Sequence, residues 1–275
     1  MNLLAVAVGG RGLVPPDEPV LPADDEALLR GRAAFETLRV YGGVPFRIGD
    51  HLQRMEASAA RLDVRWPGGF EELAEQALSA AAEPDAVLRL YLTAGRESTG
   101  KPCSLALVSA LPDGLEERRA RGIALISLLG VRAEAPWLLG GVKSTSYAVN
   151  MAAEAEARKR GADDAVFVLD EGIVLEGPVT NIWWRRGRTL FTPSLDLGIL
   201  AGVTRAVLIE AAPGAAYEVE EGHYSLAELL DSEEVFTSSS VREVMPVVDV
   251  DGTGFERGPA ADGLQQALRA SAGAS

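Results

Sequence analysis

Short apolar runs bounded by turn residues predict β-strands in the first part of the chain. The expected strands are residues 3–8, 34–40, 45–48, 86–93 and 105–109. Between them, Leu52, Met55 and Ala59 recur at the spacing of one helix face, and Asp50 precedes them as a candidate N-cap. A second helix is expected over 70–82.

The second part of the chain contains strands and helices that do not alternate strictly. Helices are expected over 147–160, 204–211 and 225–230, and strands over 122–128, 165–169, 173–175, 181–185, 189–192 and 234–237. The connection over 130–141 is expected to be irregular. This order favours two α+β or α/β domains with largely antiparallel hairpins over a doubly wound parallel sheet. Turn residues at 111–114 predict the boundary, which gives domains 1–112 and 113–275.

The charge and composition narrow the class of protein. The 275 residues include 40 acidic and 26 basic side chains, a formal net charge of −14, which argues against a nucleic-acid partner. The densest basic run, 118–121, lies beside two glutamates and is expected to form a solvated helix face. No apolar run approaches the ~20 residues of a membrane helix. Cys103 is the only cysteine, and His51 and His223 lack metal-ligand spacing, so a cytoplasmic protein without a metal site is expected.

Two candidate catalytic groups emerge from this background. Lysine is rare, and Lys143 precedes an expected helix, whose positive end disfavours an ammonium and favours the neutral amine that forms Schiff bases. Glu176 ends an apolar strand, where a carboxylate faces either solvent or a cleft. In a cleft it would keep a pyridine nitrogen protonated. Each position taken separately is also typical of an ordinary surface residue.

Several groups are candidates for binding a phosphate. Val203 and Thr204 open a helix, whose free N–H groups favour an anion. Ser239 and Ser240 offer hydroxyl groups after a strand, and Arg54 offers a balancing positive charge. An N-cap, loop serines and an exposed helix arginine would look the same, so it is their joint occurrence with Lys143 and Glu176 that indicates a site.

The ordered set of motifs resembles the class IV pyridoxal-phosphate family, which has fold type IV. The matching segments are 31–39, 51–54, 143–147, 176–181, 192–205 and 240–247. The family contains branched-chain aminotransferases, D-amino-acid aminotransferases and aminodeoxychorismate lyases. The resemblance implies two domains with pyridoxal 5′-phosphate between them, a small-molecule substrate and a homodimer.

The resemblance also implies roles for single residues. Lys143 would form the Schiff base with the cofactor and move the Cα proton, and Glu176 would pair with the pyridine nitrogen. The implied phosphate ligands are Arg54, Val203, Thr204 and Ser240, with Ser239 beside them. Tyr147 corresponds to a tyrosine near the phenolic oxygen of the cofactor, although its spacing from Lys143 is one residue shorter here.

Thr37 bears on which reaction is catalysed. In the resembling lyases a threonine in this strand assists proton transfer, whereas the branched-chain enzymes carry glycine; strand propensity would also explain a threonine. The favoured function is a 4-amino-4-deoxychorismate lyase that releases pyruvate and the folate precursor 4-aminobenzoate. The alternatives are an aminotransferase for branched-chain or D-amino acids with a 2-keto acid acceptor, and a dimer that binds the cofactor without catalysis. Arg96 is a candidate for the substrate carboxylate, and Arg89 competes with it.

Overall fold

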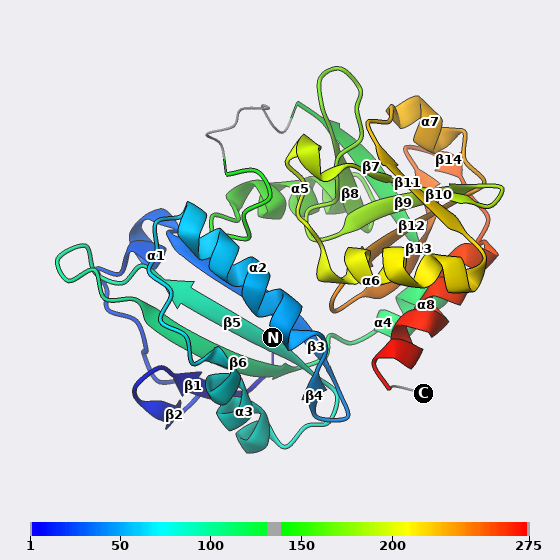
Figure 1. The fold of residues 1–275 in the computed structure, drawn as a ribbon. Helices are drawn as coiled ribbons and strands as arrows, with labels where there is room; N and C mark the ends of the chain where they lie inside the picture. The colour runs from blue at the N-terminus through cyan, green and yellow to red at the C-terminus, as the bar shows by residue number, and fades with distance from the viewer. Residues whose placement is uncertain (1, 131–138, 274–275) are drawn as a thin grey trace. The chain divides into compact units, whose positions relative to one another are not determined.

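The computed structural model describes residues 2–130 and 139–273 and divides the chain into two compact units (Figure 1). The first contains the residues up to Asp113 together with Val142–Tyr147, and the second contains the described residues of Gly114–Gly141 and Ala148–Gly273. The sequence placed Lys143 in the second domain. It lies in the first unit instead, because the backbone of Val142–Tyr147 pairs with a strand there.

The first unit is built on an antiparallel sheet. Its strands are β1 (Leu3–Val8), β2 (Gly12–Val14), β3 (Ala33–Tyr41), β4 (Val44–Pro45), β5 (Ala86–Thr93) and β6 (Cys103–Ala110). The six-stranded sheet has the order β2-β1-β6-β5-β3-β4, and every neighbouring pair is antiparallel. These strands form from runs rich in apolar residues; β1 is apolar throughout, whereas β3 also contains polar residues.

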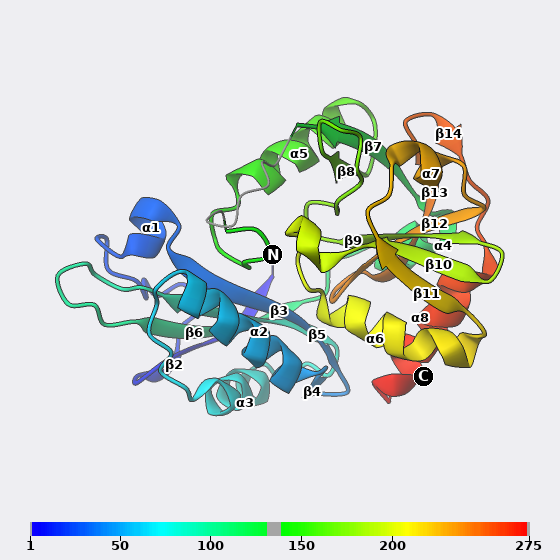
Figure 2. The same cartoon turned by 45° about the horizontal axis from the view of Figure 1, so that its top comes forward.

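Helices cover one face of this sheet. They are α2 (Ile48–Arg61) and α3 (Phe70–Ala81), which lie on the same side of the strands (Figure 2), whereas the short helix α1 (Glu26–Arg30) precedes β3. Met55 and Phe70 from these helices pack against Leu38 and Leu88 from the sheet, and all four side chains are fully buried. Because successive strand residues point to opposite faces, the residues between them face away from this core.

The second unit contains a mixed sheet. Its strands are β7 (Ile123–Leu129), β8 (Asp164–Val168), β9 (Asn181–Arg186), β10 (Thr189–Pro193), β11 (Glu218–Gly222), β12 (Glu234–Ser239), β13 (Glu243–Val250) and β14 (Thr253–Gly254). The eight-stranded sheet has the order β11-β10-β9-β12-β13-β7-β8, with β14 paired to β13. The pairs β10–β11, β13–β7 and β7–β8 are parallel, so antiparallel hairpins account for only part of this sheet.

The helices of the second unit pack around this sheet. They are α4 (Leu115–Arg121), α5 (Ala148–Lys159), α6 (Val203–Ala211), α7 (Leu226–Leu230) and α8 (Pro259–Ser271), with short 3₁₀ turns at Leu195–Leu197 and Ala212–Ala215. Figures 1 and 2 both show α6 and α8 side by side. Leu264 and Leu268 of α8 are buried, which anchors this last helix.

Most elements expected from the sequence are confirmed. The strand expected over 45–48 is reduced to β4, which ends at Pro45, and the strand expected over 173–175 is present only as isolated bridges. The paired strands expected over 181–185 and 189–192 are β9 and β10. The helix expected after Asp50 begins earlier, at Ile48, because Arg47 takes a left-handed conformation with φ of 52° and starts the first turn. Residues 131–138 of the expected irregular connection lie outside the described residues.

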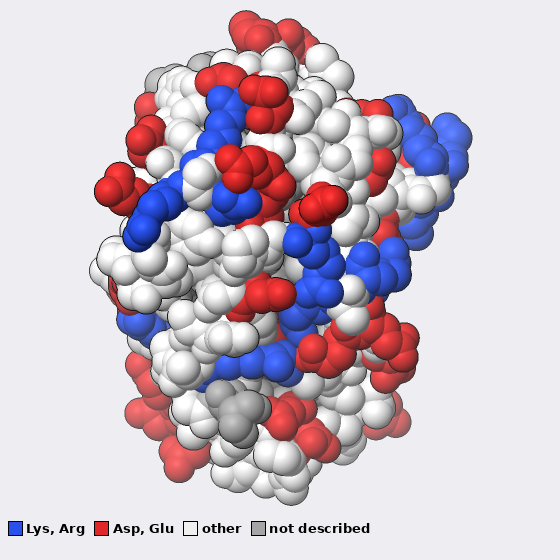
Figure 3. All heavy atoms as spheres, turned by 90° about the vertical axis from the view of Figure 1, so that its right-hand side faces the viewer, with Lys and Arg blue, Asp and Glu red and all other residues white. Residues whose placement is uncertain are grey.

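Charged side chains of both signs are interspersed on the surface drawn in Figure 3. Many form ion pairs, such as Arg121 Nη2 with Asp163 Oδ1 at 2.5 Å and Arg186 Nη2 with Asp231 Oδ2 at 3.3 Å. Within the described part of the chain, no helix is both long and apolar enough to cross a membrane.

Candidate active site

Lys143 lies on a short segment that extends the edge of the first unit's sheet. Its N–H donates to Ser58 Oγ at 3.2 Å, and its carbonyl accepts the Phe35 N–H at 3.1 Å. Two residues further on, the Thr145 N–H donates to the Ala33 carbonyl at 3.0 Å. The backbone of Lys143 is therefore held by both α2 and β3, and its side chain starts from a fixed position.

A glycine allows this segment to approach. Gly31 follows α1 with φ of 66°, and its carbonyl accepts hydrogen bonds from Thr145 Oγ1 at 3.0 Å and Ser146 Oγ at 3.2 Å. A Cβ at residue 31 would lie 2.5 Å from Ser146 Oγ. Both the left-handed backbone and the close contact therefore require glycine here.

The Lys143 amine lies against an aromatic group. Its Nζ is 4.6 Å from the centroid of the Phe35 ring, and the Tyr147 ring meets Phe35 edge-on with centroids 5.5 Å apart. Tyr91 stacks with Phe35 at 5.8 Å, and burial raises the pKa of the Tyr91 phenol. A ring face attracts an ammonium, and it also gives the neutral amine an apolar wall.

Thr37 and Arg89 lie opposite each other on neighbouring strands. The register of β3 and β5 pairs Thr37 with Arg89 and Phe35 with Tyr91, so these side chains share the sheet face opposite α2 and α3. Arg89 Nη1 donates to Ser109 Oγ at 2.9 Å, and burial lowers the pKa of the guanidinium. Thr37, the predicted catalytic residue, and Arg89, a candidate for binding the substrate carboxylate, are thus neighbours.

Arg96, the competing candidate, lies past the end of β5. Its Nε pairs with Asp24 Oδ1 at 2.7 Å, and half of its side chain is exposed. Its backbone forms an isolated bridge with Asp25. Arg89, rather than Arg96, shares the sheet face of Thr37.

Glu36, His51 and Arg54 form a buried polar cluster on the other face of β3. Glu36 accepts hydrogen bonds from Arg54 Nε at 2.8 Å and Nη2 at 2.6 Å, and its Oε2 lies 2.7 Å from His51 Nδ1. Burial would raise the pKa of Glu36, but the charge and hydrogen bonds of Arg54, together with His51, outweigh it and lower this pKa to about 2. Burial lowers the pKa of His51, and the positive charges of Arg54 and Lys143 lower it further, against the opposing effect of Glu36. Arg54, a predicted phosphate ligand, is therefore oriented by Glu36.

In the second unit, neutral donors hold the carboxylate of Glu176. The Leu200 N–H donates to Glu176 Oε2 at 3.0 Å, and Asn181 Nδ2 lies 3.5 Å from the same oxygen. Asn181 Nδ2 also donates to the Leu200 carbonyl at 3.0 Å. A Cβ at Gly202 would lie 2.1 Å from Asn181 Oδ1, so glycine is needed for this packing. The result is a buried, oriented carboxylate of the kind that pairs with a protonated ring nitrogen.

The phosphate candidates of the second unit lie at the start of α6 and at the end of β12. Gly202 is the N-cap of α6 and supplies no side-chain cap, so the first turn, with Val203 and Thr204, presents N–H groups. The Arg205 Cζ of this turn lies 5.8 Å from the centroid of the Trp183 ring, and the Trp183 indole N–H donates to Ser238 Oγ at 2.9 Å.

The three serines at the end of β12 have different surroundings. Ser238 accepts the Trp183 indole N–H, and Ser239 Oγ accepts the Arg242 N–H at 3.3 Å. Ser240 begins the turn after β12 and is half-buried. Ser238 is thus tied to β9 and Ser239 to the turn. A hydroxyl that accepts one hydrogen bond can still donate another, so Ser239 and Ser240 both stay candidates for binding a phosphate.

The chemistry of these donor groups fits pyridoxal phosphate. A lysine amine beside an aromatic ring suits its aldehyde, an oriented carboxylate suits its ring nitrogen, and an uncapped helix start with a nearby serine turn suits its phosphate. Each unit therefore presents side chains of the kinds that an enzyme dependent on this cofactor needs.

Comparison with known proteins identifies the family. The model of the amino-transferase class IV family matches residues 33–250, and the chain belongs to this family. It has the two-domain architecture of fold type IV and depends on pyridoxal phosphate.

Three relatives indicate the range of activities nearby. An aminodeoxychorismate lyase of Bacillus subtilis is 32% identical over 94% of this chain and 92% of its own length. A bifunctional aminodeoxychorismate lyase / D-amino acid transaminase of Mycobacterium tuberculosis is 34% identical over 91% of this chain and 92% of its own length. A hypothetical aminotransferase from Mycobacterium tuberculosis, solved with α-ketoglutarate and PMP bound, superimposes with a TM-score of 0.92 at 32% identity, covering 97% of this chain and 98% of the other. Lyase and transaminase relatives are thus equally close.

Sequence reasoning assigned no role to Glu36 or Asn181, although both lie within the quoted motifs. Glu36 occupies an inward-facing position of β3, between the buried Ala34 and Leu38. A carboxylate in the buried phase of a strand is itself a signal for an ion pair, because an unpaired buried charge is costly. Asn181 carried no comparable signal, since its partner Leu200 is distant in sequence.

Proposed function

We propose that the protein is a 4-amino-4-deoxychorismate lyase. The observation that carries this proposal is the register that sets Thr37 opposite Arg89, on the face where Phe35 meets Lys143. Thr37 offers a hydroxyl for proton transfer, and Arg89 offers a cation for a substrate carboxylate. The lyase relative from Bacillus subtilis supports the same choice.

The proposed chemistry assigns one task to each residue. Bound pyridoxal phosphate supplies an electron sink for the carbon that bears the substrate amine. The Lys143 amine binds the cofactor and takes the proton from that carbon, while Glu176 keeps the ring nitrogen protonated. The bond from the substrate ring to the enolpyruvyl oxygen breaks, Thr37 Oγ1 relays the proton held by Lys143 to the departing group, and pyruvate and 4-aminobenzoate are released. Arg54, Val203, Thr204, Ser239 and Ser240 hold the phosphate.

Incubation of the holoenzyme with aminodeoxychorismate tests the reaction. Pyruvate and 4-aminobenzoate should appear in equal amounts without any added 2-keto acid. Turnover that requires an amino acid together with a 2-keto acid would instead identify an aminotransferase.

The role of Thr37 has its own test. Thr37→Val keeps the shape but removes the hydroxyl, and it should lower kcat of the lyase by about a hundredfold. Thr37→Ser should restore much of this loss. Equal rates for Thr37→Val and the unaltered enzyme would remove the basis for preferring the lyase.

An aminotransferase acting on D-amino or branched-chain substrates is the second candidate. The bifunctional relative from Mycobacterium tuberculosis favours it, because that protein's name combines both activities. Half-reactions with D-alanine and with L-leucine distinguish the two substrate classes, since either would produce the corresponding 2-keto acid in an amount equal to the enzyme.

We also propose that the protein acts as a homodimer. Leu28 and Leu29 of α1 are 61% and 62% exposed, and an adjacent apolar pair on a surface is typical of an interface. Sedimentation velocity should give twice the mass of one chain, and a monomer at the concentration of the activity assay would refute this.

A further inference from the structure

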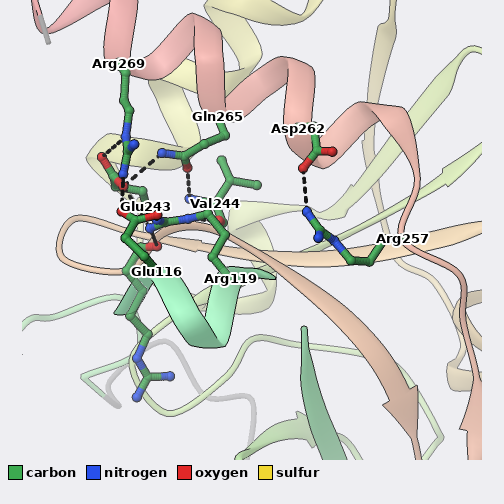
Figure 4. A network of polar contacts seen from close by, with 9 residues as sticks. Glu116, Arg119, Glu243, Val244, Arg257, Asp262, Gln265 and Arg269 are labelled. Carbon is green, nitrogen blue, oxygen red and sulfur yellow. Dashed lines mark hydrogen bonds and ion pairs between the residues drawn. The ribbon is translucent and has the colours of Figure 1, made fainter. Parts of the chain in front are cut away.

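A buried carboxylate lies just beyond the serine turn of the second unit. Glu243 is fully buried at the start of β13. Its Oε2 accepts hydrogen bonds from Arg119 Nη2 at 2.8 Å, from Arg269 Nη2 at 2.8 Å and from Gln265 Nε2 at 2.9 Å. Figure 4 shows these three side chains converging on Glu243 from α4 and α8.

The backbone of Glu243 has an unfavourable conformation, which indicates that the contacts of its carboxylate matter. β12 and β13 form a hairpin whose last pair is Ser239 with Glu243, so residues 240–242 make a three-residue turn. The residue after such a turn commonly has a left-handed backbone, for which glycine is preferred. Glu243 has φ of 57° there, a conformation that side chains disfavour. A glutamate at this position is therefore explained by what its carboxylate does.

The same network also holds the backbone on both sides of Glu243. Arg119 Nη2 donates to the Arg242 carbonyl at 2.9 Å, and Arg119 Nε donates to the Val244 carbonyl at 3.1 Å. Gln265 Oε1 accepts the Val244 N–H at 2.9 Å. The C-terminal end of the turn is thus fixed by side chains from two helices.

Two further contacts tie the ends of the turn to each other and to β8. Ser239 Oγ accepts the Arg242 N–H at 3.3 Å, and the Arg242 guanidinium pairs with Asp164. Ser240 lies between these two anchored ends. The orientation of its hydroxyl therefore depends on where the ends are held.

We propose that Glu243 is a positioning residue that holds the 240–242 turn in the conformation that binds the cofactor phosphate. This inference rests on the proposed phosphate site at Ser240. Glu243 acts through Arg119, Arg269 and Gln265 and touches neither cofactor nor substrate. Hydrogen bonding by Glu243 and by Glu116 raises the pKa of Arg269.

Binding of pyridoxal phosphate and of pyridoxal, which lacks the phosphate, tests the proposal. Both can react with Lys143, but only the first uses the phosphate site. For Glu243→Gln we expect the Kd of pyridoxal phosphate, measured from the visible absorbance of the bound cofactor, to rise about tenfold, equivalent to about 1.4 kcal/mol. The Kd of pyridoxal should stay within about twofold.

A matched control comes from α8, the helix that carries Gln265 and Arg269. Arg257 Nη2 pairs with Asp262 Oδ1 at 2.9 Å on the exposed side of α8, and Figure 4 shows this pair apart from Glu243. Asp262→Asn removes one carboxylate from α8 without touching the turn, and it should leave both Kd values unchanged. Glu243→Gly provides a second variant if Glu243→Gln folds poorly, because glycine removes the carboxylate and suits the left-handed backbone. It should show the same selective loss.

Ser240→Ala separates failure of this inference from failure of the phosphate site. If Ser240→Ala weakens pyridoxal phosphate binding and both Glu243 variants do not, Glu243 has no positioning role although the phosphate site stands. Equal weakening of pyridoxal phosphate and pyridoxal by the Glu243 variants would show a general structural role and overturn the inference. If none of the three variants changes either Kd, both the phosphate site at Ser240 and the role of Glu243 are refuted.

Discussion

In the first unit, Thr37 and Arg89 are brought together by the pairing of β3 with β5, whereas in the second unit Glu243 is held by side chains from α4 and α8. Strand register places the first pair through regular backbone hydrogen bonds. The Glu243 network depends on buried charges that must all be present, because one missing partner leaves another charge uncompensated. Reactive groups in the first unit should therefore be replaceable with local effects, and the anchors of the second unit should not.

The largest effect is expected for Lys143→Ala. Loss of the amine should lower turnover by about a thousandfold or more and abolish the visible absorbance of bound cofactor, while the far-UV circular dichroism stays unchanged. Lys159→Ala is the matched control, because Lys159 is exposed and pairs with Glu156 at 3.3 Å. Normal turnover by Lys143→Ala would show that the reactive amine is not in the first unit at residue 143.

Replacing Glu36 tests whether the first unit also contains a buried charged cluster that, like the Glu243 network, is destabilised when one partner is lost. Its pKa of about 2 in the folded protein lies below the usual 4.5, so its charged form favours folding. The shift corresponds to about 3 kcal/mol of stability, present above pH 4.5 and lost as the pH falls toward 2. Glu36→Gln should therefore lower the urea midpoint at pH 7.

The difference between Glu36→Gln and the unaltered protein should shrink as the pH falls below about 4.5. Glu56→Gln, at an exposed position of α2, should have little effect at either pH. A difference that is independent of pH would mean that packing rather than charge explains the loss.

Arg89 tests whether the register of β3 and β5 builds the substrate site. Arg89→Ala should raise KM for aminodeoxychorismate about tenfold, because a substrate carboxylate would lose its cation. Arg96→Ala should leave KM unchanged, since Arg96 is half-exposed and pairs with Asp24. The reverse pattern in steady-state kinetics would move the carboxylate site off the sheet face.

The smallest effect is expected for Gly31→Ala. The new Cβ would meet Ser146 Oγ at 2.5 Å in addition to the cost of the left-handed backbone. Gly10→Ala is the control, because Gly10 has a similar φ of 74° and a Cβ there would have no described atom within 4 Å. Urea unfolding should show Gly31→Ala less stable than Gly10→Ala by about 1 kcal/mol. Equal stabilities would mean that the Lys143 segment can move aside.

The sequence predicts much of the first unit because its signals are local. Apolar runs bounded by turn residues predict β3 and β5, and the helical spacing of Leu52, Met55 and Ala59 predicts α2, all of which the structure confirms. The ordered motifs identify the family, which the family model confirms. The roles of the single site residues remain predictions for the experiments above.

Long-range pairing explains what the sequence did not predict. Arg119 was expected on a solvated helix face, because acidic and basic residues surround it in sequence. It is buried instead, because it pairs with the buried Glu243. This partner lies 124 positions further along the chain. The residues around Arg119 in the sequence therefore do not predict that partner, and those around β7 do not predict its parallel pairing with β13.

The position of Val142–Tyr147 within the first unit also affects how the protein is made. On the ribosome, β1 to β6 emerge before this segment, and the edge of β3 at residues 33–35 lacks its neighbour until Lys143 has left the exit tunnel. The nascent chain therefore completes that sheet edge and positions Lys143, the proposed Schiff-base lysine, in the same event, after synthesis of the second unit has begun.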